Sequence, residues 1–196
     1  MSVIIDTGCA NLTSLKFAVE RLTNDVVISS DPETISSADR VFLPGVGSAH
    51  YAMGILEERD LIDVIQNLTQ PVLGICLGMQ MLTSSSSEGD IACLGLVPGN
   101  VMGLQSQGLR LPHMGWNTLA ECTDHPLLHG ISEEMYFYFV HSYGVGVSDT
   151  SIAQCEYGSR FSAAIAYKNF MGVQFHPERS SAAGSQLLKN FLEIQI

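Results

Sequence analysis

The sequence has few basic residues, no long apolar run and no basic N-terminal region. It contains 9 lysines and arginines against 20 aspartates and glutamates, a formal net charge of −11 over 196 residues. Because nucleic acids bind to basic faces, this balance argues against a nucleic-acid partner. The apolar runs fall short of the roughly 20 residues of a membrane-spanning helix, and the start does not resemble a signal peptide. We expect a soluble, cytoplasmic protein with no membrane partner.

Paired cysteines are also missing. The five cysteines are odd in number, lie far apart and form no C-x-x-C pair: Cys9, Cys76, Cys93, Cys122 and Cys155. This spacing indicates neither a disulfide framework nor a zinc site, and it is typical of a reducing compartment. We therefore expect no metal and no other cofactor.

The chain does contain short apolar runs that alternate with amphipathic stretches. Strands are predicted at 3–5, 26–28, 41–43 and 72–75, and helices at 12–22, 49–59, 61–68 and 77–82. Strands and helices that alternate in this way form a mostly parallel sheet with helices on both faces. At 196 residues the chain fits a single α/β domain, 1–196.

The second half of the chain has a different texture. Glycines, prolines and short β-prone runs between 94 and 147 predict antiparallel strands and loops that are added to the main sheet. Further strands are expected at 152–155, 163–167 and 171–175, and a closing helix at about 183–194. The serine run at 84–87 predicts a polar loop.

Cys76 lies at the centre of the most informative stretch, PVLGICLGMQML at 71–82. A strand, a sharp turn and a helix are predicted there, with Gly74 and Gly78 two residues on either side of the cysteine. Such glycines leave room where strand and helix crowd together and tolerate a strained turn that exposes a nucleophile. N–H groups at a helix start favour a thiolate and a developing oxyanion. From this stretch alone, a small buried hydrophobic cysteine remains the alternative.

A histidine and a carboxylate follow the strand predicted at 171–175. Pro177 favours an extended chain at His176, and in an extended chain positions two apart, such as His176 and Glu178, share a side. A carboxylate beside a histidine fixes the tautomer of a base that serves a nucleophile. A surface turn is the alternative for this motif taken alone.

Two other segments have both a functional and a structural interpretation. In Pro44-Gly45-Val46-Gly47, the glycines allow backbone N–H groups to face a bound oxygen, as in an oxyanion hole, or simply form a strand-to-helix turn. Trp116 is the only tryptophan and lies among loop-forming residues at 113–117. It is either a core or loop anchor or a hot spot facing a partner. For His141, which follows an aromatic strand, a functional and a structural role are likewise both open.

Taken together, GICLGMQ at 74–80, PGVG at 44–47 and FHPERS at 175–180 closely resemble the motifs of the triad-type, class I glutamine amidotransferases. That family has a flavodoxin-like fold. PHMGWN at 112–117, YFVHSY at 138–143 and DTGCAN at 6–11 look like the blocks of its members that serve as glutaminase subunits of imidazole glycerol phosphate synthases. The resemblance covers the whole chain. It implies hydrolysis of L-glutamine and transfer of ammonia to a (β/α)8-barrel cyclase subunit, in a heterodimer of histidine biosynthesis.

The resemblance also implies roles for the matching residues. Cys76 would attack the glutamine amide, His176 would be its base, and Glu178 would orient the histidine. The oxyanion would be held by N–H groups at Gly45, Val46 and Leu77, after the peptide of Val46 has turned. Residues that would bind glutamine are Gly47, Gln80, Glu88, Ser142 and Tyr143. Residues that would face the partner are Asn11, Trp116, Tyr138 and Arg179.

Three alternatives remain open, and one local departure from the family is evident. A glutaminase for another synthase, such as the one that makes anthranilate, fits the PHMGWN and PGVG blocks less well. A non-catalytic relative should have lost one of the three catalytic residue types, and a stand-alone cysteine hydrolase should turn over without a partner. Cys9 and Ala10 replace other small residues of many relatives, which would alter packing at the partner interface.

Overall fold

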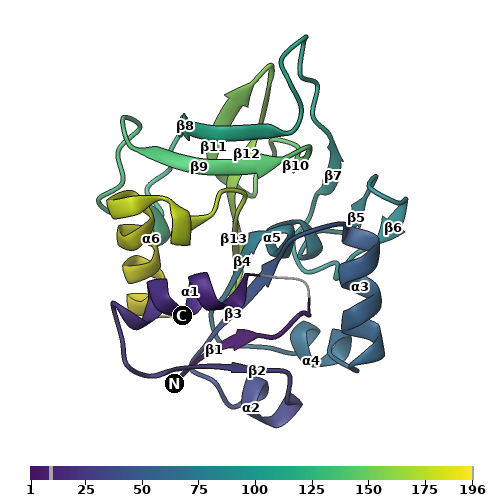
Figure 1. Cartoon of the computed structure of the whole chain (residues 1–196), viewed down its shortest axis with the longest axis vertical. Coiled ribbons are helices and arrows are strands. Elements are labelled where there is room, and N and C mark those ends of the chain that lie inside the picture. Colours follow the sequence, from purple (N-terminus) through teal and green to yellow (C-terminus); the bar gives the residue numbers. More distant parts are fainter. Residues whose placement is uncertain (9–10, 196) are drawn as a thin grey trace.

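A seven-stranded sheet forms the centre of the molecule, which is a computed structural model that describes residues 1–8 and 11–195 (Figure 1). Its strand order is β11-β12-β13-β4-β3-β1-β2. The strands are β1 (Ser2–Ile5), β2 (Val26–Ser29), β3 (Arg40–Gly45), β4 (Val72–Cys76), β11 (Ser151–Tyr157), β12 (Ser159–Tyr167) and β13 (Phe170–Val173). Pairing is parallel from β13 to β2 and antiparallel where β12 and β11 extend the sheet. The predicted mostly parallel sheet is confirmed.

Helices cover both faces of this sheet, as Figure 1 shows. They are α1 (Leu12–Glu20), α2 (Pro32–Ser36), α3 (Ala49–Glu58), α4 (Ile62–Gln66), α5 (Leu77–Met81) and α6 (Ser181–Glu193), with 3₁₀ turns η1 (Pro126–Leu128) and η2 (Pro177–Arg179). Side chains of β1 alternate between the two cores: Ile4 packs with α1 and α6, whereas Val3 and Ile5 pack with α2, α3, α4 and α5. The predicted helices therefore exist, with ends that differ by a few residues.

The strands between 94 and 147 correct one prediction, because they do not join the main sheet. β7 (Asn100–Gly103) and β10 (Tyr143–Val145) form a separate sheet with β5 (Ser85–Ser86) and β6 (Ile91–Ala92), so part of the predicted serine loop is a strand. β8 (His113–Thr118) and β9 (Tyr136–His141) form a two-stranded sheet, and Trp116 lies in β8 instead of a loop. The antiparallel addition to the main sheet comes from β11 and β12.

Packing of β9 explains why it forms a layer of its own. Phe137 and Phe139 are fully buried, and both rings contact Phe175, with centroid distances of 4.3 and 5.6 Å. The alternate residues Tyr136, Tyr138 and Val140 are exposed or half-buried. The apolar face of β9 thus covers the residues that follow β13. This places β9 above the carboxyl ends of β3 and β4.

The longest helix, α6, has 13 residues. Within residues 1–8 and 11–195, no helix has the length and apolar character needed to cross a membrane. The predicted departure at Cys9 and Ala10 lies outside the described residues.

Candidate active site

Cys76 occupies a strained turn between β4 and α5. Its φ of 53° and ψ of −109° lie in a region that side-chain-bearing residues rarely adopt. A Cβ at Gly78 would lie 1.7 Å from the Leu43 carbonyl oxygen, and one at Gly74 would lie 2.7 Å from the carbonyl carbon of Gly78. Only glycine fits at these two positions, so the predicted sharp turn between a tightly packed strand and helix is confirmed.

Strand pairing brings His176 to the cysteine. β13 runs parallel to β4 with Val173 opposite Ile75, and the chain continues past the sheet edge to His176. The Nδ1 atom of His176 lies 2.8 Å from Oε1 of Glu178, and each side chain is 7% exposed. The two residues do not lie in one extended segment as predicted, because the 3₁₀ turn η2 begins at Pro177. The turn nevertheless directs the carboxylate to the imidazole.

His176 is held in its charged form. Burial disfavours the imidazolium, but the neighbouring Cys76 and Glu178 outweigh this effect and raise the pKa of His176 to about 10. An imidazolium beside a cysteine stabilises a thiolate, which is the reactive form of sulfur. The buried atoms Nε2 of His176 and Oε2 of Glu178 have no hydrogen-bond partner among the described residues. A buried donor without a partner is costly, so Nε2 is available to a substrate or to the sulfur.

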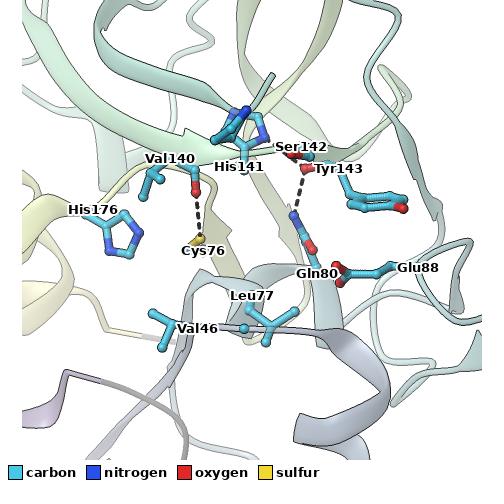
Figure 2. Close-up of a pocket in the computed structure, with 12 residues that line it drawn as sticks. Val46, Cys76, Leu77, Gln80, Glu88, Val140, His141, Ser142, Tyr143 and His176 are labelled. Atoms are coloured by element: carbon cyan, nitrogen blue, oxygen red, sulfur yellow. Dashed lines mark hydrogen bonds between the residues drawn. The ribbon is translucent and has the colours of Figure 1, made fainter. Parts of the chain in front are cut away.

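A cavity of about 290 Å³ opens beside Cys76 (Figure 2). This volume suits a small molecule. It is lined by most of the predicted catalytic, oxyanion and glutamine-binding residues: Val46, Gly47, Cys76, Leu77, Gln80, Glu88, Ser142, Tyr143 and His176. Figure 2 shows Cys76 and His176 at one end and Glu88 at the other. An amide at the sulfur end and an ammonium near the carboxylate would match the two ends of glutamine.

The turn predicted for the oxyanion lies at the edge of this cavity. Gly45 is opposite Cys76 in the pairing of β3 with β4. Val46 is 40% exposed, and Gly47 has a φ of +94° with open space where a side chain would project. Val46, Gly47 and Leu77 therefore line the same cavity as the sulfur. No more than five residues form α5, so the nearby N–H of Leu77, and not a long helix dipole, would act on an oxyanion.

Two predicted glutamine-binding side chains have protein partners of their own. The Glu88 carboxylate accepts a hydrogen bond from the Ala49 N–H at 3.0 Å, at the start of α3, through Oε2. Its other oxygen is left for a ligand. Gln80 donates from Nε2 to the Tyr143 carbonyl and to Oε1 of Gln174, both at 2.9 Å. The side-chain NH₂ group of Gln80 is therefore already hydrogen-bonded to protein atoms.

Residues predicted to face a partner gather on a second side of the site. Tyr138 contacts the 52% exposed Trp116, with ring centroids 6.0 Å apart, and the Arg179 guanidinium lies 5.6 Å from the centre of the Tyr138 ring. Asn11 and Arg179 line a smaller cavity of about 110 Å³, which also reaches His176. Asn11 in addition caps α1, because its side chain accepts from the Ser14 N–H at 3.3 Å.

The family model for class-I glutamine amidotransferases matches residues 3–194 of this chain. The chain belongs to this family.

Relatives of this amidotransferase include subunits named imidazole glycerol phosphate synthase subunit HisH. The subunit of Colwellia psychrerythraea is 55% identical, over 98% of this chain and 92% of its own length. That of Vibrio cholerae is 57% identical, over 98% of each chain.

Solved structures of low identity share the fold. The glutaminase domain of CTPS from Trypanosoma brucei, solved with bound acivicin, superimposes with a TM-score of 0.70 at 16% identity, over 97% of this chain and 91% of that one. A glutamine amidotransferase from Thermotoga maritima gives 0.68 at 16% identity, over 98% and 96%.

Sequence reasoning left the role of His141 open and missed two other buried polar side chains of this amidotransferase, Gln174 and His113. His113 Nδ1 lies 3.1 Å from His141 Nε2, and His141 Nδ1 lies 2.8 Å from the Tyr143 carbonyl. Burial lowers the pKa of His113 to about 4 and that of His141 to about 3, so both rings are neutral at pH 7. Within the described residues, no group of three or more histidine, cysteine or acidic side chains is arranged to hold a metal ion.

Proposed function

We propose that this chain is the glutaminase subunit of an imidazole glycerol phosphate synthase. It would hydrolyse L-glutamine to glutamate and ammonia, and ammonia would pass to a cyclase subunit that makes imidazole glycerol phosphate and AICAR in histidine biosynthesis. The observation that carries this proposal is the 55–57% identity to HisH subunits over 98% of the chain. We further propose a single domain, 1–196, that acts in the cytoplasm, where its thiols stay reduced.

The proposed reaction begins with attack of the Cys76 sulfur on the γ-carbonyl carbon of glutamine. The carbonyl electrons move to the oxygen, which N–H groups at 45–46 and at Leu77 would stabilise. His176 gives the proton from Nε2 to the amide nitrogen, the C–N bond breaks, and ammonia leaves a γ-glutamyl thioester. The imidazole then takes a proton from water, hydroxide attacks the thioester, and glutamate and the thiolate are released. Glu178 keeps the ring in position through its 2.8 Å contact with Nδ1.

Substrate orientation follows from the two ends of the cavity. The free carboxylate oxygen of Glu88 would hold the α-ammonium of glutamine, since a buried cation requires an opposite charge. Backbone groups of Ser142 and Tyr143, on the wall that β9 and β10 provide, would bind the α-carboxylate. This arrangement directs the side-chain amide to Cys76.

The partner would cover the surface formed by Trp116, Tyr138, Arg179 and Asn11. Aromatic and arginine side chains are typical anchors of protein interfaces. Because the smaller cavity joins this surface to His176, ammonia released at the histidine would have a short route to a partner bound there. We propose a (β/α)8 barrel as that partner and a heterodimer as the complex.

The proposal is tested by measuring glutamate release from glutamine under two conditions. The first assay contains the isolated chain. The second adds the cyclase subunit of a HisH relative and its ribonucleotide ligand. We expect slow release alone and a rise of at least about tenfold in the complex, as a population shift towards a competent oxyanion turn predicts. Fast release without the partner would indicate a stand-alone hydrolase. No release under either condition would contradict the proposed function.

A further inference from the structure

We propose that Gln174 is a positioning residue that donates a hydrogen bond to the Cys76 sulfur and so stabilises the sulfur when it becomes the nucleophile. Its side chain is completely buried, and Nε2 lies 3.7 Å from Sγ of Cys76. The second hydrogen bond of the sulfur is donated by the Cys76 thiol to the Val140 carbonyl, at 4.0 Å, and is lost when the thiol ionises. A carbonyl oxygen repels a thiolate, whereas an amide N–H stabilises it. The amide of Gln174 is thus the neutral donor that faces the nucleophile.

The direction of this hydrogen bond is fixed by a carbonyl group that can only accept. The Tyr143 carbonyl lies 2.9 Å from the Gln80 amide, which must therefore present its NH₂ group there. The same NH₂ group is 2.9 Å from the Gln174 amide, so Gln174 must turn its oxygen towards Gln80. Its own NH₂ group can then only point to the sulfur. An amide flip would place two donors against each other.

The histidine pair supports the same direction from the other side of the Tyr143 carbonyl. The neutral His141 donates from Nδ1 to this carbonyl, which leaves Nε2 as an acceptor for the Nδ1–H of His113. Among the described residues, the side chains of His141 and Gln80 thereby occupy the two lone pairs of this carbonyl. The series of hydrogen bonds runs without a break from His113 to Cys76.

One short segment after β13 places two side chains, Gln174 and His176, beside the Cys76 sulfur. Gln174 and His176 are two residues apart at the end of β13, whereas Phe175 between them is buried against Phe137 and Phe139. Because the pairing of β13 with β4 ends with Val173 opposite Ile75, the next residues reach Cys76. The amide therefore orients the sulfur from within the protein, while the imidazole remains on the cavity side.

This inference rests on the proposed function only in taking Cys76 as the nucleophile. Alkylation of Cys76 by iodoacetamide reports on the thiolate without glutamine or a partner, so it can fail or succeed independently of glutaminase activity. The test variant is Gln174→Glu, which keeps an oxygen for the Gln80 amide but puts a carboxylate at the sulfur. The matched control is Gln66→Glu, at a partly buried glutamine whose Nε2 donates to the Leu94 carbonyl at 2.8 Å, away from the site.

We expect Gln174→Glu to slow alkylation of Cys76 at pH 7 by about 10- to 100-fold, the range for a hydrogen bond to a charged group. The midpoint of the alkylation profile should move up by about 1 to 2 pH units, so that high pH restores the rate. In the complex, kcat should fall with little change in KM. Gln66→Glu should leave the alkylation profile unchanged. An unchanged profile in folded Gln174→Glu would overturn the proposal.

Two further tests apply if Gln174→Glu does not fold: an uncharged variant, and a measurement on the wild-type chain. Gln174→Met has a similar length and no donor, and it should also shift the alkylation midpoint upward. In the wild-type chain, the side-chain amide ¹⁵N signal of Gln174 should move when Cys76 is alkylated, and that of Gln66 should not. If the Gln174 signal does not respond, the hydrogen bond to sulfur is absent and the proposal is wrong.

Discussion

Replacing His176 with asparagine should lower kcat for glutamate release in the complex by about 10²- to 10⁴-fold, the usual contribution of general acid–base catalysis. The imidazole of His176 is buried, and its raised pKa keeps it protonated at pH 7. Its Nε2 atom has no hydrogen-bond partner among the described residues. Asparagine can still bond to Glu178, but it cannot carry a proton to the leaving nitrogen. Steady-state kinetics at saturating glutamine measure the loss.

The matched control for this prediction is His125→Asn. His125 is a half-buried histidine outside the cavity, and its Nδ1 accepts from the Leu127 N–H at 3.1 Å. Asparagine is a good cap at such a position, so kcat should stay within about twofold. The double variant Cys76→Ala with His176→Asn should be no slower than Cys76→Ala alone, because the two residues act as a unit. Activity of His176→Asn close to wild type would remove the histidine from the proposed mechanism.

Replacing Gly78 with alanine should lower the free energy of unfolding by about 3 kcal/mol or more, at the upper end for overpacking. The new methyl group would lie 1.7 Å from the Leu43 carbonyl oxygen and 2.8 Å from its carbon. Both are backbone atoms of β3, which cannot move away without breaking the sheet beside Cys76. Denaturant unfolding of the isolated chain measures the change.

Gly54→Ala provides the control in a helix with free space. No heavy atom lies within 4 Å of a Cβ built on Gly54, in the middle of α3. Alanine should stabilise the chain there by up to about 1 kcal/mol, since glycine is a poor helix former. Equal stability of the two variants would mean that α5 and β3 are less tightly packed than the structure indicates.

The nucleophile turn and the alternation of strands and helices could be predicted because they depend on local pattern. Two glycines around Cys76 and apolar runs of strand length are properties of neighbouring residues. The layer to which β9 belongs could not be predicted. An alternating strand fits the edge of the main sheet as well as a separate layer, and the contacts of Phe137 and Phe139 with Phe175 decide between them.

Hydrogen bonds between distant residues were equally hidden. His113 and His141 are 28 positions apart and meet only because β8 and β9 pair in one particular register. Gln174 lies immediately before FHPERS at 175–180, and nothing in that pattern by itself predicts a contact with Cys76. Its spacing of two from His176, which follows the strand predicted at 171–175, nevertheless carried a signal, since in an extended chain both side chains point the same way.

Covalent capture of the glutamine γ-carbonyl by Cys76 is tested most directly by mass spectrometry of the complex, quenched in acid during turnover. A γ-glutamyl adduct should appear on the peptide that contains Cys76, and it should be absent, together with glutamate release, in Cys76→Ala. Release of glutamate by Cys76→Ala at the wild-type rate, with no adduct on any cysteine of the wild type, would contradict the mechanism.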